Sequence, residues 1–273
     1  MPREGEGEGS AVAEAPVPGA SGDGPGAGDN VVLWPPPPGR RIRCPACGGL
    51  GEPVEGKEGV CRCDDCAALF LNPRPSAGEV LKDRNERFKG ALRRNHSAEI
   101  RRELEVAQEA MRGYHRLVSG KDAILNAFGR KVLDLGSGLG FRMRECIHYG
   151  WTAVGLEPSA NALAYTKALM LDVVQADFDK PPRVRFDLVL AEDLLDEIPE
   201  PAAVVAAVRK VLGPKGVFCV SVGEPGGPDI RPGKLCLFTE ESLLRMVMPA
   251  GFSEPRREAV NGRLRLWFPV KAN

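Results

Sequence analysis

Two pairs of cysteines near the N-terminus have the spacing of a metal site. Two residues separate Cys44 from Cys47 and Cys63 from Cys66, and fifteen residues lie between the pairs. This arrangement is typical of a zinc ion held by four thiolates. Four thiolates fill the coordination sphere of Zn²⁺, so the predicted zinc is structural. Cys61 could replace Cys63 as a ligand, but the two-residue spacing favours Cys63.

A glycine-rich turn ends the stretch KVLDLGSGLG, residues 131–140. Its glycines follow the spacing G-x-G-x-G, whereas dinucleotide-binding turns have G-x-G-x-x-G. The turn also lacks the Lys-Ser/Thr pair of a phosphate-binding P-loop, and Asp134 just before it does not suit a pyrophosphate. In open α/β sheets, ligands bind at the carboxyl ends of the strands. We therefore expect a nucleoside-type ligand that needs no phosphate cradle.

Acidic residues at the ends of the next two predicted strands make this ligand more specific. Glu157 ends the second strand, 21 residues after Gly136, where a carboxylate can accept hydrogen bonds from two ribose hydroxyls. Asp177 and Phe178 end the third strand. They offer an acceptor for an exocyclic amine and an apolar face beside a purine. Together these side chains predict an adenosine site.

The hydrophobic pattern after residue 130 predicts an α/β fold. Strands are expected at 131–136, 151–157, 172–177, 186–192 and 216–222, and helices at 139–149, 159–170 and 201–212. Alternating strands and helices predict a doubly wound, mostly parallel sheet with helices on both faces. A helix at 239–249 and two strands, 252–260 and 263–271, follow. Asn261-Gly262 between these strands is a strong hairpin signal, so an antiparallel hairpin completes a sheet of seven strands.

The chain divides into four predicted segments. Residues 1–39 are rich in Gly, Pro, Ala and Glu and are expected to form a disordered tail. Residues 40–75 form the zinc ribbon, 76–128 a helical linker, and 129–273 the sheet domain. The linker is basic from Lys82 to Glu103, which indicates either a solvated helix face or a lid over an anionic substrate.

Composition excludes several classes of protein. The 37 basic and 37 acidic residues cancel, so net charge indicates no particular partner. No run of 18 apolar residues and no secretory signal is present, and clustered cysteines point to metal rather than disulfides. We therefore expect a cytoplasmic protein with no membrane partner.

Several motifs in order resemble the class I S-adenosylmethionine-dependent methyltransferases. They are VLDLGSGLG, VGLEPS, QADF and the segment from FDLVLAEDLLDEIPEP to VRKVLGPKGVFCVSV, and the resemblance covers roughly residues 130–270. It implies S-adenosylmethionine as cofactor, with Asp134, Gly136 and Gly138 along its methionine part. Glu157 would take the ribose, Asp177 and Phe178 the adenine, and Glu192 would lie near the transferring methyl group. Residues 40–75 are similar to the zinc ribbon that precedes some bacterial methyltransferases.

The resemblance implies a methyl transfer that depends mainly on alignment of the reacting atoms. A hydroxyl or phenol acceptor would also need a general base, and the candidates lie in the loop after the fourth strand: Glu192, Asp193, Asp196 and Glu197. Of these we prefer Asp193. Relatives often have a histidine in this loop where this chain has Glu197.

Three functions remain open at this point. The favoured one is methyl transfer to an O, N or C nucleophile of a small molecule, with the ribbon and basic helix capping the pocket. The second is an RNA- or protein-directed methyltransferase that docks through the ribbon, so nucleic acid is a partner that we do not favour. The third is a protein that binds S-adenosylmethionine without turnover.

Overall fold

The computed structural model describes residues 42–120, 129–223, 233–260 and 263–272, except the side chains of residues 259 and 260. The chain divides into two units, Met1–Val31 and Val32–Asn273, and every described residue belongs to the second. The tail predicted at 1–39 and the turn predicted at Asn261-Gly262 lie outside the described residues.

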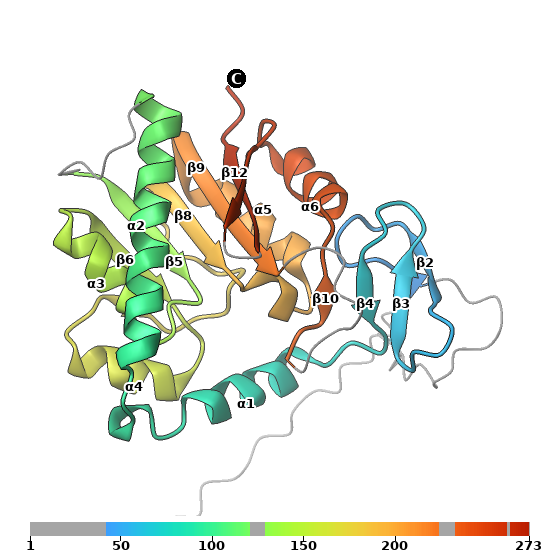
Figure 1. Cartoon of the computed structure of the whole chain (residues 1–273), viewed down its shortest axis with the longest axis horizontal. Coiled ribbons are helices and arrows are strands. Elements are labelled where there is room, and N and C mark those ends of the chain that lie inside the picture. Colours follow the sequence, from blue (N-terminus) through green and yellow to red (C-terminus); the bar gives the residue numbers. More distant parts are fainter. Residues whose placement is uncertain (1–41, 121–128, 224–232, 261–262, 273) are drawn as a thin grey trace, which may run out of the picture. The chain divides into compact units, whose positions relative to one another are not determined.

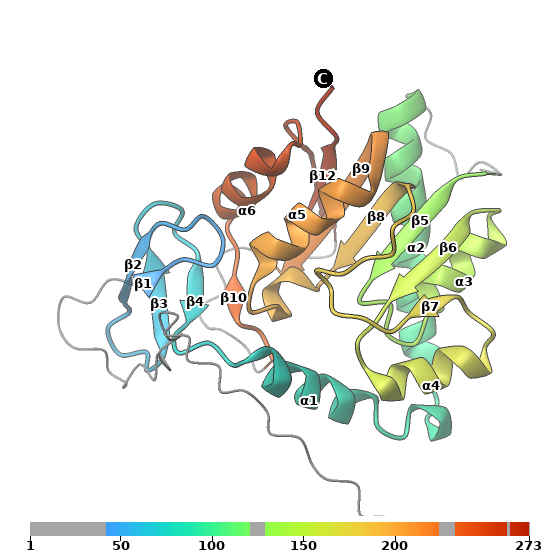
Figure 2. The same cartoon turned by 180° about the vertical axis from the view of Figure 1, so that it is seen from behind.

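A sheet of seven strands forms the main body of the second unit (Figures 1 and 2). Its order is β11-β12-β9-β8-β5-β6-β7. The five strands from β9 to β7 are parallel, and β12 pairs antiparallel with both β9 and β11. The bounds are β5 Lys131–Leu135, β6 Thr152–Leu156, β7 Val173–Val174, β8 Phe186–Glu192, β9 Leu212–Gly223, β11 Arg256–Val260 and β12 Arg263–Pro269. The predicted fold class is confirmed.

Helices cover both faces of this sheet, as the two views show. On one face, α2 (Ser97–Ser119) and α3 (Phe141–His148) pack against apolar side chains that include Leu188 and Trp267. On the other face, α5 (Pro201–Val211) and α6 (Glu240–Val247) pack against side chains that include Val189 and Phe218. The remaining helices are α1 (Ala77–Phe88) and α4 (Ala160–Ala168).

Some predicted elements differ in extent from the observed ones. β9 begins four residues early, because Leu212 pairs with Phe186 ahead of a bulge. β11 begins late, at Arg256, because Pro255 has no N–H for the ladder; Phe252 makes only an isolated bridge to Val270. The linker contains α1, a 3-10 turn at Ala91–Arg93 and α2, and Gly90 with φ 68° separates α1 from that turn.

A second, smaller sheet contains the cysteine segment. Its order is β1-β2-β3-β4-β10, with β1 Ile42–Arg43, β2 Leu50–Pro53, β3 Val60–Cys63, β4 Leu69–Leu71 and β10 Cys236–Leu237. The fifth strand was not predicted, since it comes from the segment between β9 and α6. Cys236 pairs with Phe70 and Leu237 with Leu69.

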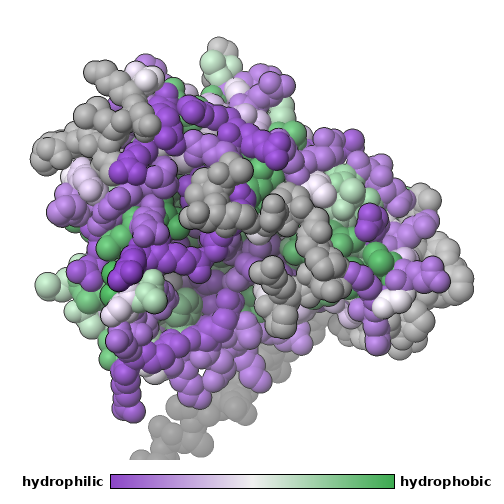
Figure 3. Space-filling view, in the orientation of Figure 1, coloured by the Kyte–Doolittle hydropathy of each residue, from purple (hydrophilic) through white to green (hydrophobic). Residues whose placement is uncertain are grey.

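One face of the molecule is mostly polar. In the face shown in Figure 3, hydrophilic residues dominate the described part and apolar residues gather in small patches. No helix among the described residues is long and apolar enough to cross a membrane.

The strand order places the candidate site at the carboxyl ends of the central parallel strands of the large sheet. β5 lies between β6 and β8, so the order reverses there, and ligands of such sheets bind beside the reversal. The register pairs Leu135 with Leu156 and Asp134 with Leu190. Gly136 follows β5, Glu157 follows β6 and Glu192 ends β8, so the three residues lie at the same end of these parallel strands.

Candidate cofactor and metal sites

The glycine turn after β5 has a backbone that only glycine adopts readily. The φ angles of Gly136, Gly138 and Gly140 are 67°, 52° and 77°, all in the left-handed region. The Gly136 amide donates to the Leu156 carbonyl at 2.9 Å, which ties the turn to the end of β6. The turn is thereby held beside Glu157.

Glu157 is fully buried at the end of β6, and its carboxylate accepts four hydrogen bonds. Two come from backbone amides, Gly138 at 3.1 Å and Ser159 at 3.0 Å. The other two come from Arg84, whose Nε lies 2.7 Å from Oε1 and whose Nη2 lies 2.6 Å from Oε2. A guanidinium therefore holds the carboxylate that the sequence assigns to a ribose.

Arg84 projects from α1, and its side chain is only 7% exposed. Its guanidinium carbon lies 5.3 Å from the ring centre of Phe178 and 5.5 Å from that of Phe88. Its Nη1 also lies 3.4 Å from an oxygen of Glu197. Arg84 thus contacts Glu157, Phe88, Phe178 and Glu197 around the predicted cofactor site. In the sequence it belongs only to a basic run.

A cavity of about 290 Å³ opens beside Arg84, where the adenine is expected. Pro158, Asp177 and Phe178 line one side, and α1 and the segment Glu197–Pro199 line others. The Asp177 carboxylate faces outward and pairs with Lys180 at 2.6 Å. The two predicted adenine residues therefore border an open space with one apolar wall, which suits a purine.

Asp134 is buried at the end of β5 and paired with Arg142 of α3. Arg142 Nε donates to Oδ1 at 3.0 Å, and Nη2 donates to the Gly136 carbonyl at 3.0 Å. The remaining Nη1 pairs with Glu103 of α2. Burial raises the pKa of Asp134 to about 6, against the opposing effect of Arg142. Arg142 was not predicted, and it fixes both the carboxylate and the glycine turn.

Glu192 is buried at the end of β8 and faces β9 and β12. The Ser221 hydroxyl donates to its carboxylate, and Arg265 Nη2 donates to Oε2 at 3.3 Å. Both side chains of the Glu192–Arg265 pair are only 2% exposed. Arg265 was not singled out from the sequence, although the alternation RLRLW places Arg263, Arg265 and Trp267 on one face of the strand.

Asp193 follows with a left-handed backbone, φ 51°. Its carboxylate pairs with Arg102 of α2 at 3.0 Å and with Arg263 of β12. Burial raises the pKa of Asp193, while the two arginines and Lys234 oppose that shift. Two arginines therefore hold the preferred candidate base, and it could take a proton only after one of them moves.

Six of the seven predicted cofactor residues fall into two groups, and the seventh, Asp177, borders the cavity and faces outward. Gly136, Gly138, Glu157 and Phe178 meet around the Arg84 guanidinium. Asp134 and Glu192 lie on the sheet face under α2, each paired with its own arginine.

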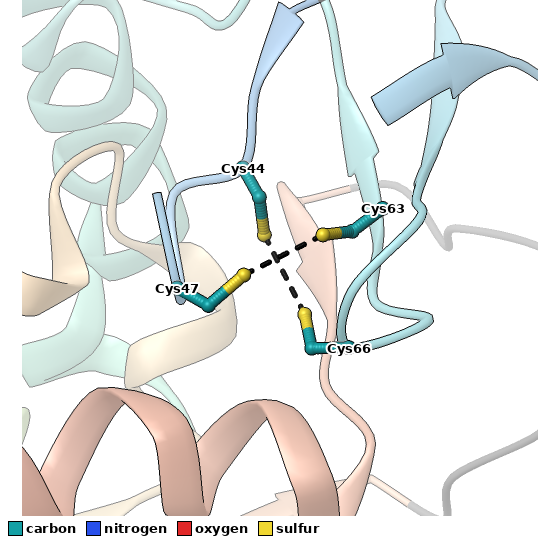
Figure 4. Close-up of side chains that lie close together, drawn as sticks. All are labelled: Cys44, Cys47, Cys63 and Cys66. Carbon is teal, nitrogen blue, oxygen red and sulfur yellow. Dashed lines mark hydrogen bonds between the residues drawn. The ribbon is translucent and has the colours of Figure 1, made fainter. Parts of the chain in front are cut away.

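The four predicted metal ligands lie together in the small sheet (Figure 4). The Cys44 and Cys66 sulfurs are 3.7 Å apart, those of Cys47 and Cys63 are 3.5 Å apart, and all four lie within 4.8 Å of one another. A Zn–S bond of ~2.3 Å gives an S···S edge of ~3.8 Å in a tetrahedron. The sulfurs therefore fit a tetrahedral zinc ion. Cys61 lies outside this group, and burial raises its pKa to about 11.

The segment 234–239 connects this cluster to the loop after β8. The Thr239 hydroxyl donates to the Cys66 carbonyl at 2.7 Å, and the Leu235 amide donates to the Asp196 carbonyl at 2.6 Å. Lys234 Nζ lies 2.9 Å from Asp196 Oδ1 and 3.2 Å from Glu197 Oε1. The metal-binding turn and the loop with the candidate bases are therefore linked by hydrogen bonds.

Comparison with known proteins agrees with this geometry. Residues 133–220 match the family described as the methyltransferase domain. The strand order and the glycine turn of this segment resemble those of class I S-adenosylmethionine-dependent methyltransferases.

The curated relatives that match include ubiquinone biosynthesis O-methyltransferases. That of Psychrobacter cryohalolentis is 29% identical over 130 residues, 42% of this chain and 49% of that protein. That of Klebsiella pneumoniae subsp. pneumoniae is 31% identical over 141 residues, 48% of this chain and 56% of that protein. The chain thus spans about half the length of the curated relatives it matches.

Among solved structures, the [4+2]-cyclase SpnF has a TM-score of 0.51 at 18% identity, covering 63% of this chain and 81% of that one. This likeness shows the fold alone. Because that neighbour is described as a cyclase, the fold by itself does not define the reaction.

Proposed function

We propose that this chain is an S-adenosylmethionine-dependent methyltransferase that acts on a small-molecule acceptor. The main support is Glu157: a fully buried carboxylate that receives the Gly138 amide, beside a cavity bordered by Phe178, inside the matched domain. The relatives named as O-methyltransferases of ubiquinone biosynthesis favour a small acceptor. The acceptor atom could be O, N or C.

The residues that would hold the cofactor follow from their positions. Asp134, Gly136 and Gly138 would contact the methionine part, Glu157 the ribose, and Asp177 with Phe178 the adenine. When bound, S-adenosylmethionine supplies a methyl group on a positively charged sulfur, which makes the methyl carbon electrophilic. The cavity proposed for the adenine is open. A ribose can bind Glu157 only after Arg84 has left that carboxylate.

The chain's own part in the reaction is alignment and exclusion of water, which in favourable cases supplies ~7–11 kcal/mol. Glu192, held by Arg265 and Ser221, is a fixed negative charge near the acceptor and not a mobile base. Asp193 stays the candidate base for a hydroxyl acceptor. It could accept a proton once Arg102, which is 56% exposed, swings away.

We further propose that Cys44, Cys47, Cys63 and Cys66 bind one structural zinc ion. Support comes from the sulfur spacing and from the chemistry of four thiolates, which leaves no open position on the metal. Clustered thiols in a metal-binding arrangement also agree with a cytoplasmic location, where cysteines stay reduced.

A binding protein without turnover is the second candidate. It is favoured by one observation: the two candidate catalytic carboxylates, Glu192 and Asp193, are each paired with an arginine. In this case the carboxylates would serve the fold.

Two measurements on the purified full chain separate these candidates. Calorimetry with S-adenosylhomocysteine measures cofactor binding, and transfer of an isotope-labelled methyl group from S-adenosylmethionine to phenol, amine and carbon-acid panels measures turnover. We expect both. Binding without transfer to any acceptor would support the second candidate, and failure to bind would refute the methyltransferase proposal.

A further inference from the structure

Helix α1 lies directly over the glycine turn, although it belongs to the linker before the matched domain. Arg84 Nη2 lies 3.1 Å from the place where a Cβ on Gly136 would stand. Phe88 Cζ lies 3.2 Å from the corresponding place on Gly138. Two side chains of α1 therefore fill the space against both glycines, which is where the proposed function puts the cofactor.

The two side chains belong to one face of the helix. Ala77, Val80, Leu81 and Arg84 line the cavity, and Phe88 follows Arg84 by four residues. Residues at these spacings lie on one side of a helix. α1 thus presents a continuous, mainly apolar surface to the cofactor site, with one guanidinium in it.

The contact between Arg84 and Glu157 is a strong ion pair. It is bidentate, charge-assisted and buried, and contacts of this kind are stronger than hydrogen bonds between neutral groups. Removing either partner alone would leave a buried charge unpaired. A ligand that takes Glu157 must therefore leave Arg84 with another acceptor.

Glu197 offers that acceptor. One of its oxygens already lies 3.4 Å from Arg84 Nη1, and it also pairs with Arg87 at 3.0 Å and Lys234 at 3.2 Å. A small displacement of α1 could move Arg84 from Glu157 to Glu197, so that its buried guanidinium would never be left without an acceptor.

The capping box of Ser76 and Glu79 stabilises the start of α1, so the helix can shift as one unit, and the left-handed Gly90 follows its end. On the side of α4, the helix is held by polar contacts through Asn85, which accepts from Ser159 Oγ at 2.8 Å and from Asn161 Nδ2 at 2.8 Å. Hydrogen bonds of this kind exchange for water at little net cost.

We propose that α1 is a movable cover of the cofactor site and that Arg84 competes with the cofactor's ribose for Glu157. This inference rests on the proposed function. The closed arrangement reduces the apparent affinity for the cofactor by the fraction of molecules that are open. Removing the competitor therefore raises that affinity, in contrast to the loss expected when a binding residue is removed.

The test is calorimetric titration of the full chain with S-adenosylhomocysteine, comparing wild type with Arg84→Met. We expect the variant to bind roughly tenfold tighter or more, as expected for a closed state that predominates. Lys82→Met is the matched control, because Lys82 is an exposed cation on the same helix. It should bind like wild type.

A second measurement does not depend on the variant folding. In wild type, saturating S-adenosylhomocysteine should speed amide hydrogen exchange in residues 77–88, because the ligand displaces the helix. Equal or weaker ligand binding by Arg84→Met, or slower exchange in α1 on binding, would overturn the cover while leaving the proposed function standing. If neither wild type nor Arg84→Met binds S-adenosylhomocysteine, both the cover and the proposed function are refuted.

Discussion

The Thr239 hydroxyl donates a 2.7 Å hydrogen bond to the carbonyl of Cys66, a predicted metal ligand. Thr239 is also the N-cap of α6, where its oxygen accepts from the Ser242 amide at 3.0 Å. One side chain therefore fixes both the start of a helix on the large sheet and the second metal-binding turn. The two parts of the chain are coupled at this point.

Replacing this side chain should loosen both structures. Thr239→Val keeps the shape of the side chain but removes both hydrogen bonds, and loss of an N-cap costs about 1 kcal/mol. We expect faster hydrogen exchange in α6 and in residues 63–71. Thr152→Val, at an exposed position on β6, is the matched control. If exchange in residues 63–71 stays at the wild-type rate, the coupling is absent.

The zinc site makes a prediction that separates two neighbouring cysteines. Cys63→Ser should lose most of the zinc, because Cys63 belongs to the group of four sulfurs, whereas Cys61→Ser should retain it. Metal binding in a small ribbon is coupled to its folding, so Cys63→Ser should also unfold residues 40–75. Metal analysis of the reduced proteins gives the result. The reverse order would show that Cys61 is the ligand.

Glu157 should matter for both binding and stability. Glu157→Ala removes the predicted ribose acceptor, and we expect S-adenosylhomocysteine affinity to fall tenfold or more, since an unpaired buried polar group costs ~1–3 kcal/mol. The same change strands Arg84, so the free energy of unfolding should fall by about 3–5 kcal/mol.

The double variant Glu157→Ala/Arg84→Met separates the two effects. It should recover much of the stability without recovering the affinity, as chemical denaturation and calorimetry would show. Affinity in the double variant equal to that of Arg84→Met alone would mean that Glu157 does not hold the ribose.

The pH dependence of stability should reveal Asp196. Burial raises the pKa of its carboxyl from 3.8 to about 6, although Lys234 opposes the shift. Between these values the folded protein binds a proton that the unfolded chain does not, so stability falls as pH rises from 4 to 6. Asp196→Asn lacks this loss. Its stability relative to wild type should rise over that range by about 1.4 kcal/mol per pKa unit, measured by urea denaturation; a constant difference would contradict the shift.

The packing of α2 on the sheet requires Gly113. A Cβ there would lie 2.1 Å from the Trp267 ring, so Gly113→Ala should lower the free energy of unfolding by ~1–3 kcal/mol or more. Gly78→Ala is the matched control in α1, where the nearest atom to a Cβ is 3.9 Å away. It should raise stability by ~0.4–1 kcal/mol. Thermal denaturation of both variants checks the contrast.

The fold and the cysteine cluster could be predicted because their signals are local. The glycine turn, the alternating strands and the paired cysteines each lie within short stretches, and the observed sheet and sulfur cluster match them. The partners of the charged residues could not be predicted. Arg84 lies in a basic run that is typical of a solvated face, and its acceptor Glu157 is 73 residues away.

Short elements also escaped prediction. β10 has only two residues, too few to show a periodicity, and it forms because β4 offers a free edge. Arg142 follows the glycine turn on α3, but only the folded structure brings it to Asp134. Tertiary contacts, and not residue type alone, decide these pairings.

The buried pair of Glu192 and Arg265 constrains how this sequence can change over generations. The two residues are 73 positions apart in the sequence. Losing either one alone leaves a buried charge unpaired, at a cost of about 3–5 kcal/mol. Domains have only ~5–15 kcal/mol of stability in total, so a lineage with one change would be selected against before the second arose. We expect homologous chains to keep both residues or to have neither, so that an arginine on this strand predicts the acid at the end of β8.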